Sequence, residues 1–349
     1  MELKLKKFKD VDLEDVFFDS LKNDYSEFSD WFEKKSEDHA YVFYGDTGID
    51  GFLYLKLEEG PVDDVTPPLP AKNRLKVGTM KINPHGTRMG ERFIKKIFDH
   101  ALRFSVEEIY VTVFSHHQAL KSLFCRYGFS EKAKKVTPNG EELVLVRDIM
   151  EDRGDQDKNY PVIYCDTNKA YLLSLHPIFH TKLLPDSKLN NESFDVTEDV
   201  SSANSIHKVY LTAMDVGVLR KGDVLVVYRT NDGKGPARYR SVATSVGVIE
   251  ERRTINSFSN WEDFYRYCRP HSVFSRSELE SFWNTKKYPQ VLKFSYNLSF
   301  SKRITRGTMI DEVGLREDQY WGFFELSKSQ LRDLVRRGMG NESLIVNKA

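Results

Sequence analysis

The sequence predicts a protein of mixed α/β structure with two domains, and three observations lead to this prediction. The chain has 349 residues, which is long for one hydrophobic core and suits two. Residues 1–150 alternate strand and helix periodicity, whereas residues 161–349 hold many short strand-like stretches and few helices. Between them, the segment MEDRGDQDKNYP (150–161) is acidic and has no apolar periodicity. We therefore expect domains at 1–150 and 161–349, joined by a linker at 151–160.

The composition is that of a globular protein, with 40% hydrophobic, 13% aromatic and 30% charged residues. The three cysteines are far apart in sequence, which fits neither a disulfide framework nor the spacing of a metal site. The first ten residues, MELKLKKFKD, lack the apolar centre of a signal peptide. No apolar run approaches the ~18 residues that a membrane-spanning helix needs. We expect a cytoplasmic protein with reduced thiols, no metal site and no membrane contact.

Charge is unevenly distributed, although Lys and Arg equal Asp and Glu over the whole chain at 52 each. Residues 1–150 carry a net charge of −3, residues 151–200 carry −5, and residues 201–349 carry +8. A basic C-terminal part indicates a polyanionic partner. The alternative is a solvated surface with a surplus of Lys and Arg.

Periodicity predicts the elements of both domains in order. Residues 59–73 contain four prolines and are expected to interrupt any strand or helix. In the first domain we expect a strand at 2–8, helices at 13–24 and 30–36, a hairpin at 40–58, a strand at 75–82, a helix at 86–104, a strand at 108–114, a helix at 117–127 and paired strands at 131–137 and 142–148. In the second we expect strands around 224–229, 238–250, 290–305 and 320–327, and helices around 260–268, 275–284, 307–314 and 328–337.

Residues 83–98 (NPHGTRMGERFIKKIF) connect the strand at 75–82 to the following helix through a tight polar turn. The free N–H groups and the positive dipole end of a helix N-terminus form an anion site. Gly86 and Gly90 suit a backbone that approaches a ligand closely, and Arg88 between them offers several donors to a phosphate. The pattern predicts a phosphate-binding turn. The alternative is an ordinary loop in which Arg88 is a solvated surface residue.

Two local stretches carry a resemblance to the GNAT superfamily of acyl-CoA-dependent N-acetyltransferases. The consensus sequence of the family's phosphate turn is R/Q-x-x-G-x-G/A. This chain has HGTRMG at 85–90, which keeps only the last glycine of that consensus. The second stretch, HQALKSLFCRYGF at 117–129, resembles N-x-x-A-x-x-L-Y-x-x-x-G-F. It keeps Leu123, Gly128 and Phe129 and has His117 for Asn and Phe124 for Tyr. Each stretch alone is only weakly similar to the family. Taken together, their order and their spacing, over about 145 residues, resemble the family more closely.

The resemblance implies a mixed sheet flanked by helices and acetyl-CoA as co-substrate. In the family, the pantetheine arm pairs with the backbone of a strand that splays from its neighbour, and the pyrophosphate is held at the turn. The implied coenzyme contacts are Met80, Lys81, Ile82, Gly86, Thr87, Arg88, Met89, Gly90, Glu91 and Phe124.

The chemistry requires an unprotonated acceptor amine, a stabilised oxyanion and often an acid for the leaving thiolate. The family's frequent acid is the Tyr replaced here by Phe124. Histidine can act as a base near neutral pH. The candidate catalytic residues are therefore His117, Tyr127 and Glu58, with Ser115, His116, Cys125 and Glu59 as alternatives. Each of these also has a structural interpretation as a cap, a core residue or a solvated side chain.

The second domain resembles the PUA-like superfamily, which includes the ASCH and EVE domains, in the stretches at 178–184, 222–230, 242–251 and 321–326. The resemblance implies a mixed β-barrel that binds RNA or a modified nucleobase, because aromatic and basic side chains together suit base stacking and phosphate contact. The alternative is that the rings belong to the core and the cations to a solvated face. The candidate residues are Lys208, Tyr228, Arg229, Arg238, Arg240 and Trp321.

Three hypotheses of function follow. The first is an N-acetyltransferase whose acceptor amine lies on an RNA, such as a tRNA, presented by the PUA-like domain. The second is an N-acetyltransferase for a small-molecule or protein amine, with the barrel as sensor or scaffold. The third is a protein that binds coenzyme A and nucleic acid without catalysis, which the glycine-poor turn and Phe124 favour. The sequence does not identify the acceptor or the oligomeric state.

Overall fold

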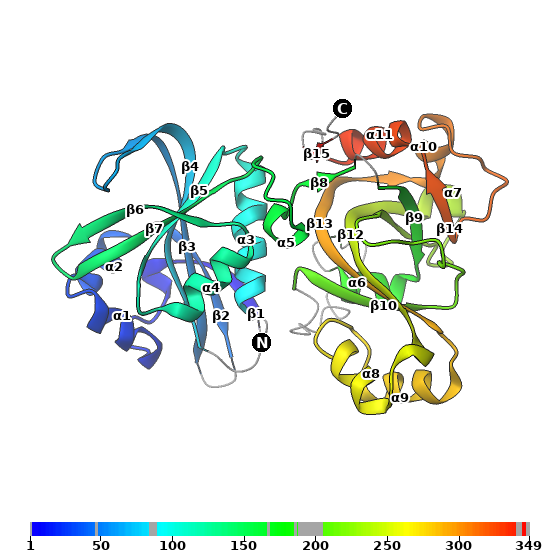
Figure 1. Ribbon diagram of the computed structural model, residues 1–349, viewed down its shortest axis with the longest axis horizontal. Coiled ribbons are helices and arrows are strands. Elements are labelled where there is room, and N and C mark those ends of the chain that lie inside the picture. The colour runs from blue at the N-terminus through cyan, green and yellow to red at the C-terminus, as the bar shows by residue number, and fades with distance from the viewer. Residues whose placement is uncertain are drawn as a thin grey trace. The chain divides into compact units, whose positions relative to one another are not determined.

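The computed structural model describes residues 2–45, 48–83, 89–165, 168–184, 187, 205–339 and 344–346. The chain divides into two compact units, Met1–Asn159 and Tyr160–Ala349. Each unit is built around its own sheet with flanking helices (Figure 1). The prediction of a mixed α/β fold is therefore confirmed. Among the described residues, no helix combines the length and the apolar character needed to cross a bilayer.

A seven-stranded sheet, counted over the described residues, forms the first unit in the order β1-β2-β3-β4-β5-β7-β6. Its neighbours are antiparallel except β4 and β5, which are parallel. The crossover between these two is the helix α3, as parallel pairing requires. The strands are β1 (Glu2–Lys7), β2 (His39–Tyr44), β3 (Ile49–Val62), β4 (Leu69–Ile82), β5 (Glu108–Phe114), β6 (Ser130–Thr137) and β7 (Gly140–Asp148).

Helices pack on both faces of this sheet. On β3, a Cβ at Gly51 would meet side chains of α3, whereas the next residue, Phe52, contacts rings of the N-terminal segment and α2. Alternate strand residues therefore face opposite layers, as strand geometry dictates. Figure 1 shows α1 and α2 together, away from α3. The helices are α1 (Asp19–Asp24), α2 (Phe28–Lys34), α3 (Met89–Arg103), α4 (Gln118–Arg126) and α5 (Gln156–Asn159).

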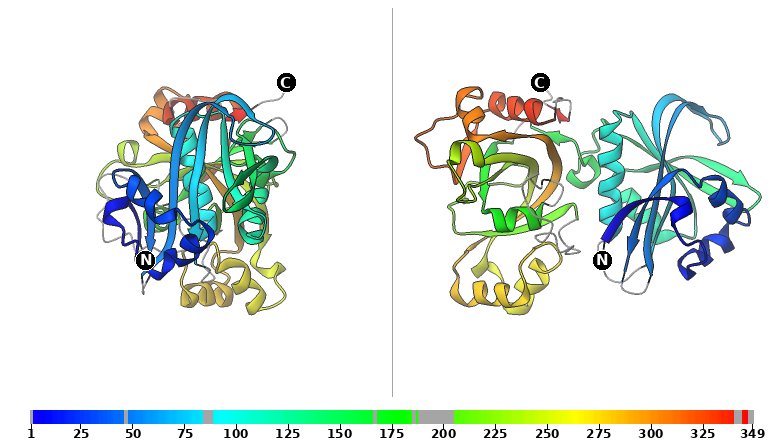
Figure 2. Two further views of the ribbon diagram at one scale, coloured as in Figure 1. Left: turned by 90° about the vertical axis from the view of Figure 1, so that its left-hand side faces the viewer. Right: turned by 180° about the vertical axis from the view of Figure 1, so that it is seen from behind.

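The proline-rich segment is the end of a strand hairpin, so the prediction that residues 59–73 interrupt any strand is wrong for 59–62 and 69–73, and the strands are interrupted only at 63–68. β3 and β4 pair from Gly51 and Ile82 out to Val62 and Leu69, and they form a curved arm (Figure 1; Figure 2, right). Pro61 falls at a shift of the pairing register, and Pro70 is exposed on the arm. Proline is tolerated at such irregular and peripheral positions because no ladder hydrogen bond needs its missing N–H.

The second unit has a six-stranded sheet over the described residues, in the order β10-β13-β12-β11-β9-β14. β9 and β11 are parallel and the other neighbours antiparallel. The predicted closed barrel is wrong for the described strands, because β10 and β14 form the two open edges of the sheet. The strands are β8 (Ile163–Tyr164), β9 (Ala170–Leu175), β10 (His207–Thr212), β11 (Val224–Arg229), β12 (Val242–Thr254), β13 (Gln290–Thr305), β14 (Phe323–Leu326) and β15 (Ile345–Val346), of which β8 and β15 form a separate parallel pair.

Helices of the second unit are short, and α8 and α9 pack together at one end of it (Figures 1 and 2). The strand predicted at 238–250 is wrong at its start, because residues 237–240 form α7 and the strand begins at Val242. Pro236 sets the fixed φ that a helix entry accepts. The helices are α6 (Pro177–Leu183), α7 (Ala237–Arg240), α8 (Trp261–Cys268), α9 (Arg276–Thr285), α10 (Arg306–Asp311) and α11 (Lys328–Met339).

A buried ion pair holds β4 to β5 where their pairing begins. Arg74 and Glu108 are register partners, and Arg74 Nε donates to Glu108 Oε2 at 2.8 Å. The guanidinium also donates to the carbonyls of Gly60 and Pro70. Lys72 donates to the same carboxylate from the surface side. Because Arg74 is 1% exposed, these acceptors compensate the cost of burying its charge.

We predict that Arg74→Met destabilises the first unit by about 3–5 kcal/mol, the cost of removing one partner of a buried pair. In calorimetric melting of the full chain we expect one transition for each unit, and the transition of the first unit should move to lower temperature. Lys134→Met removes an exposed ion pair with Glu141 and should leave both transitions nearly in place. Equal shifts for the two variants would contradict a structural role for the Arg74 pair.

Candidate functional site

The two parallel strands of the first sheet pair for only part of their length. β4 and β5 are partners from Arg74–Glu108 to Val77–Val111. Beyond that point β4 remains paired with β3 as far as Ile82, and β5 remains paired with β7 as far as Phe114. The facing edges of β4 and β5 therefore separate while each strand keeps its outer neighbour. Backbone groups on these inner edges need partners, and an extended amide-bearing ligand can supply them.

A β-bulge at Gly78 lies where β4 leaves β5. Tyr54 and Leu55 on β3 pair with Thr79 and Val77, so Gly78 is the extra residue. Bulges bend a strand and increase its twist, which accounts for the separation starting here. A Cβ at Gly78 would lie 2.6 Å from Tyr54 Cδ1, so the position has no room for a side chain.

A cavity of about 890 Å³ lies in the gap between these strands. The separated parts of β4 and β5 form its walls, and α1, α2, the start of α4 and the β6–β7 hairpin complete it. Its aromatic lining includes Tyr25, Phe28, Trp31 and Tyr54. Its ionisable lining consists of Asp24, Glu27, Lys35, Lys56, Glu58, Lys76, Lys81, His116, His117, Lys135 and Glu142. The cavity can therefore hold a ligand with apolar and charged parts.

His117 is positioned at the cavity by the end of β5 and by an acidic partner. It precedes α4, and its Nε2 lies 3.1 Å from Asp24 Oδ2 at the end of α1. A carboxylate only accepts, so Nε2–H donates to Asp24, and Nδ1 of the neutral ring carries the lone pair. The His117 side chain is 40% exposed, so a ligand can reach it. This arrangement suits a proton acceptor whose tautomer is fixed by its partner.

Glu58 also lines the cavity, but its carboxylate is already engaged. It accepts hydrogen bonds from the Tyr110 hydroxyl and, at 2.8 Å, from Lys56 Nζ, and Lys76 Nζ lies 3.9 Å away. Burial alone would raise the pKa of Glu58, but these donors and the nearby lysines hold it below its usual value. Glu58 is therefore held as a carboxylate and is a poor proton acceptor.

Two further polar contacts order the cavity wall. The Tyr25 hydroxyl donates to Glu142 Oε1 at 2.6 Å, which connects the α1–α2 segment to β7. Burial, together with this hydrogen bond and the charge of Glu142, raises the pKa of Tyr25 above its usual range. Lys81 Nζ donates to Ser20 Oγ at 2.6 Å and to the carbonyl of Phe17. Burial lowers the pKa of Lys81 despite the nearby acids of α1.

The sequence-predicted residues of the first domain fall into three groups. Met80, Lys81, Ile82, Gly90, Glu58 and His117 line the cavity. Met89, Glu91, Phe124 and Tyr127 are buried and are not among the lining residues. Gly86, Thr87 and Arg88 lie outside the described residues.

Two of the four buried residues, Phe124 and Met89, have packing partners that explain their positions. The Phe124 ring packs 4.9 Å from that of Phe129, and Met89 lies against the open backbone of Gly51. Tyr127 is fully buried at the end of α4.

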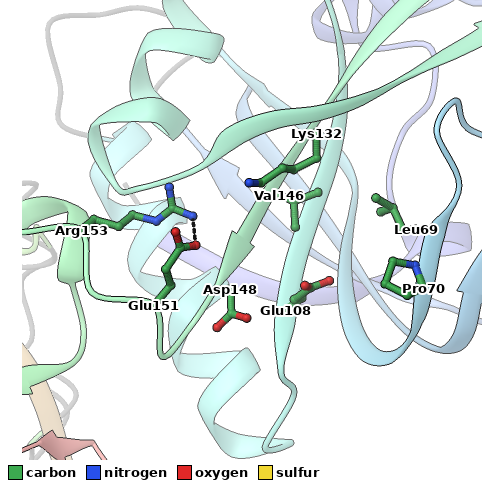
Figure 3. Close-up of a pocket in the computed structure, with 8 residues that line it drawn as sticks. All are labelled: Leu69, Pro70, Glu108, Lys132, Val146, Asp148, Glu151 and Arg153. Carbon is green, nitrogen blue, oxygen red and sulfur yellow. Dashed lines mark hydrogen bonds and ion pairs between the residues drawn. The ribbon is translucent and has the colours of Figure 1, made fainter.

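A smaller pocket of about 260 Å³ is lined by Glu108 and seven further residues (Figure 3), and Glu108 is the ion-pair partner of Arg74. Acidic side chains from three segments surround it, namely Glu108, Asp148 and Glu151. Each is paired: Glu108 with Arg74 and Lys72, Asp148 with Lys72, and Glu151 with Arg153. This pocket belongs to the ion-pair network that holds the sheet together.

Most residues predicted to contact nucleic acid are buried in the second unit. Lys208, Tyr228, Arg229 and Trp321 are 0–8% exposed. The Tyr228 and Trp321 rings lie 5.4 Å apart, and the Arg306 guanidinium lies 4.6 Å from the Trp321 ring. So much burial leaves little ring surface to stack on a base.

The two predicted arginines of α7 are partly exposed and paired with acids. Arg238 donates to both Asp311 oxygens at 2.6 Å, and Arg240 Nε donates to Asp232 Oδ1 at 2.6 Å. Exposed or partly exposed cations lie beside aromatic rings at α8 and α9. There Arg269 and Arg276 lie 6.0 and 5.3 Å from the Tyr265 ring, and Lys286 lies 3.5 Å from that of Trp283.

Sequence reasoning missed the residues that α1, α2 and β7 bring to the cavity, among them Asp24, Tyr25, Trp31 and Glu142. Asp24 and His117 are 93 positions apart, and Tyr25 and Glu142 are 117 apart, so no local pattern connects them. One signal was available: Gly78 inside a strand pattern indicates a bulge or a close approach.

Solved structures of two kinds are similar to parts of the chain. No family model matches the sequence, and the search of curated proteins finds no match. Chaetomium thermophilum Naa20 in complex with a bisubstrate analogue is 15% identical, with a TM-score of 0.33 over 45% of this chain and 91% of that one. A phosphinothricin N-acetyltransferase is 14% identical, with a TM-score of 0.31 over 43% and 100%. The ASCH protein from Zymomonas mobilis is 11% identical, with a TM-score of 0.30 over 48% and 94%. Functional assignment therefore depends on the geometry of the chain itself.

Proposed function

We propose that the first unit is an acyl-CoA-dependent N-acyltransferase that transfers an acetyl group to an amine. The observation that carries this proposal is the separation of β4 and β5 beyond Val77 and Val111, with a cavity of about 890 Å³ between them. The resemblance to the GNAT superfamily implies that the pantetheine arm occupies such a gap. In this chain the unpaired inner edge of β4, around Met80–Ile82, would pair with the amides of the arm.

Gly90 supports the same placement of the coenzyme. It is the second residue of α3, lines the cavity and corresponds to the last glycine of the predicted phosphate turn. A Cβ here would lie 2.8 Å from Leu123 Cδ2, so the α3–α4 contact already uses the available space. The N-terminus of α3 would add its dipole and free N–H groups as donors to the pyrophosphate. Arg88 would contribute a charged donor.

In the transfer itself, the amine nitrogen attacks the thioester carbonyl carbon, a C–N bond forms, and the C–S bond breaks to release the thiolate of coenzyme A. The proton lost by the amine passes to His117 Nδ1, because Asp24 holds Nε2–H. The proton then neutralises the thiolate. Glu58 is not assigned this role because Tyr110 and Lys56 already bind its oxygens. The aromatic lining from α1 and α2 would hold the acceptor and exclude water.

Coenzyme binding is the first test. We predict that the full chain binds acetyl-CoA with roughly micromolar affinity in titration calorimetry, and that Gly90→Trp abolishes binding by filling the gap. Gly90→Ala, whose Cβ meets only the flexible end of Leu123, should bind with an intermediate affinity. A melting curve of each variant shows that it is folded. Absence of binding heat for the wild type at high ligand concentration would rule out the transferase function.

The role of His117 is tested by kinetics once an acceptor is found by screening polyamines, amino acids, lysine peptides and tRNA for release of coenzyme A. His117→Ala should lower kcat about 10²–10⁴-fold, with little change in the KM for acetyl-CoA. Asp24→Asn should lower kcat less, because the amide keeps the shape of the carboxylate but can fix the wrong tautomer. His39→Ala, at an exposed histidine of β2, is the control. An unchanged kcat in His117→Ala would assign the base to another residue.

A second candidate function is binding of single-stranded RNA by the second unit, with RNA as the carrier of the acceptor amine. The specific observation in its favour is the α8–α9 surface, defined here as Tyr265, Arg269, Arg276, Trp283 and Lys286. Arg269 and Arg276 are exposed and lie beside a partly exposed ring, which suits phosphate contact with base stacking. If the acceptor is instead a small-molecule or protein amine, the second unit would serve as a sensor or scaffold for the transferase.

Filter binding of cellular RNA to the full chain in a salt series tests this second candidate. Affinity should fall steeply with salt because bound phosphates release counterions. Tyr265→Ala should cost roughly 1–3 kcal/mol of binding with little loss of stability. Trp321→Ala, at a buried ring, should instead lower the stability of the unit by about 3–5 kcal/mol, and Tyr320→Ala, 72% exposed beside it, should change neither property. Failure of the wild type to bind RNA at low salt would exclude an RNA partner.

A further inference from the structure

Three potential metal ligands converge at the edge of the cavity. Asp24 ends α1, and His116 and His117 follow β5, so two separate elements bring them together. His117 Nε2 lies 3.1 Å from Asp24 Oδ2, and His116 Nε2 lies 4.0 Å from Asp24 Oδ1. One ligand atom from each of the three residues lies within 4.8 Å of the others. Tetrahedral zinc, with bonds of about 2.0–2.2 Å, places its ligand atoms roughly 3.3–3.6 Å apart.

Packing orients both imidazole rings toward the carboxylate. The His116 ring stacks on Phe114 with a centroid separation of 5.4 Å and an interplanar angle of 13°. The His117 ring contacts the His116 ring at 4.2 Å and lies 6.3 Å from Phe114. Phe114 itself is buried and also packs against Tyr25, the residue after Asp24. The two sides of the cluster therefore share one aromatic support, which limits the reorganisation that binding an ion would require.

We propose that Asp24, His116 and His117 form a binding site for a divalent transition-metal ion, with Zn²⁺ as the best fit. Two imidazole nitrogens and one carboxylate oxygen are a donor set that zinc accepts, whereas Mg²⁺ and Ca²⁺ prefer oxygen ligands. All three residues line the cavity, so a fourth position faces the space available to a ligand or water. A three-ligand site with one open position differs from the closed four-ligand sites that serve structure alone.

Metal binding would regulate the transfer reaction, a consequence that rests on the proposed function. The ion takes the lone pair of His117 Nε2, so the ring must carry its proton on Nδ1. In the metal-free protein the hydrogen bond to Asp24 fixes the opposite tautomer. A ring protonated on Nδ1 cannot accept a proton there. Bound zinc would therefore inhibit the transferase, and removing the ion would restore it.

The direct test is titration of the tag-free full chain with Co²⁺, whose visible absorption reports a four-coordinate N/O site, followed by competition with Zn²⁺. The wild type should bind one ion per chain at this site. His116→Ala, His117→Ala and Asp24→Asn should each weaken binding by at least about tenfold. His39→Ala is the matched control and should bind like the wild type, because His39 is an exposed histidine outside the cavity lining. Absence of the spectrum, or equal binding by all the variants, would overturn the proposal.

A second measurement examines the regulatory consequence. With excess Zn²⁺ the wild-type transfer rate should fall roughly tenfold or more relative to its own rate with a chelator. His116→Ala should need at least about tenfold more Zn²⁺ for the same fractional inhibition. Because both proteins release the thiol of coenzyme A, which also binds zinc, this comparison controls for zinc lost to the product. Equal sensitivity of the two proteins would overturn inhibition through this site. Because Co²⁺ binding needs neither acetyl-CoA nor turnover, an inactive protein that binds Co²⁺ would refute the transferase and leave the metal site standing.

Discussion

The incomplete pairing of β4 with β5 is the constraint on which the candidate site depends. Arg74 and Glu108 hold the strands together at one end, and the bulge at Gly78 turns β4 away at the other. Neither feature would produce a cavity alone. The ion pair is the buried polar contact between the two strands. Without the bulge, the β4–β5 hydrogen-bond ladder could continue beyond Val77 and Val111. Together they leave the inner edges of β4 and β5 without a strand partner among the described residues, and such backbone groups need a partner.

The same cavity brings together chemistry from distant parts of the chain. α1 contributes Asp24, the end of β5 contributes His117, and β7 contributes Glu142 as the acceptor for Tyr25. These contacts fix the tautomer of a histidine and connect the N-terminal helices to the sheet. The base role needs the lone pair of His117 on Nδ1, whereas metal binding at this cluster needs it on Nε2, and a neutral imidazole has only one such nitrogen. Acid–base catalysis and metal binding therefore compete for the same imidazole.

The second unit shows how burial changes the meaning of a sequence pattern. Alternating aromatic and basic residues along strands suggest a stacking surface, yet Tyr228, Arg229 and Lys208 are interior. The buried His180 shows the same effect on a polar group: its Nε2 lies 2.8 Å from Thr244 Oγ1, and burial lowers the pKa of His180 to about 3. That histidine stays neutral at physiological pH. Partly exposed rings with adjacent cations occur at α8 and α9.

The sequence by itself determined the mixed α/β class, most element positions in both units, and the strand at 75–82 and histidine at 117 that border the cavity. These features follow from local periodicity and from turn residues, and both can be recognised from residues that are close together in the sequence. Tertiary structure alone decided that residues 59–62 and 69–73 extend a hairpin, that Phe124 and Tyr127 face the core, and that the second sheet is open over its described strands. It also decided the meeting of Asp24 with His117, because these residues are 93 positions apart and the chain between them must fold before the carboxylate reaches the imidazole.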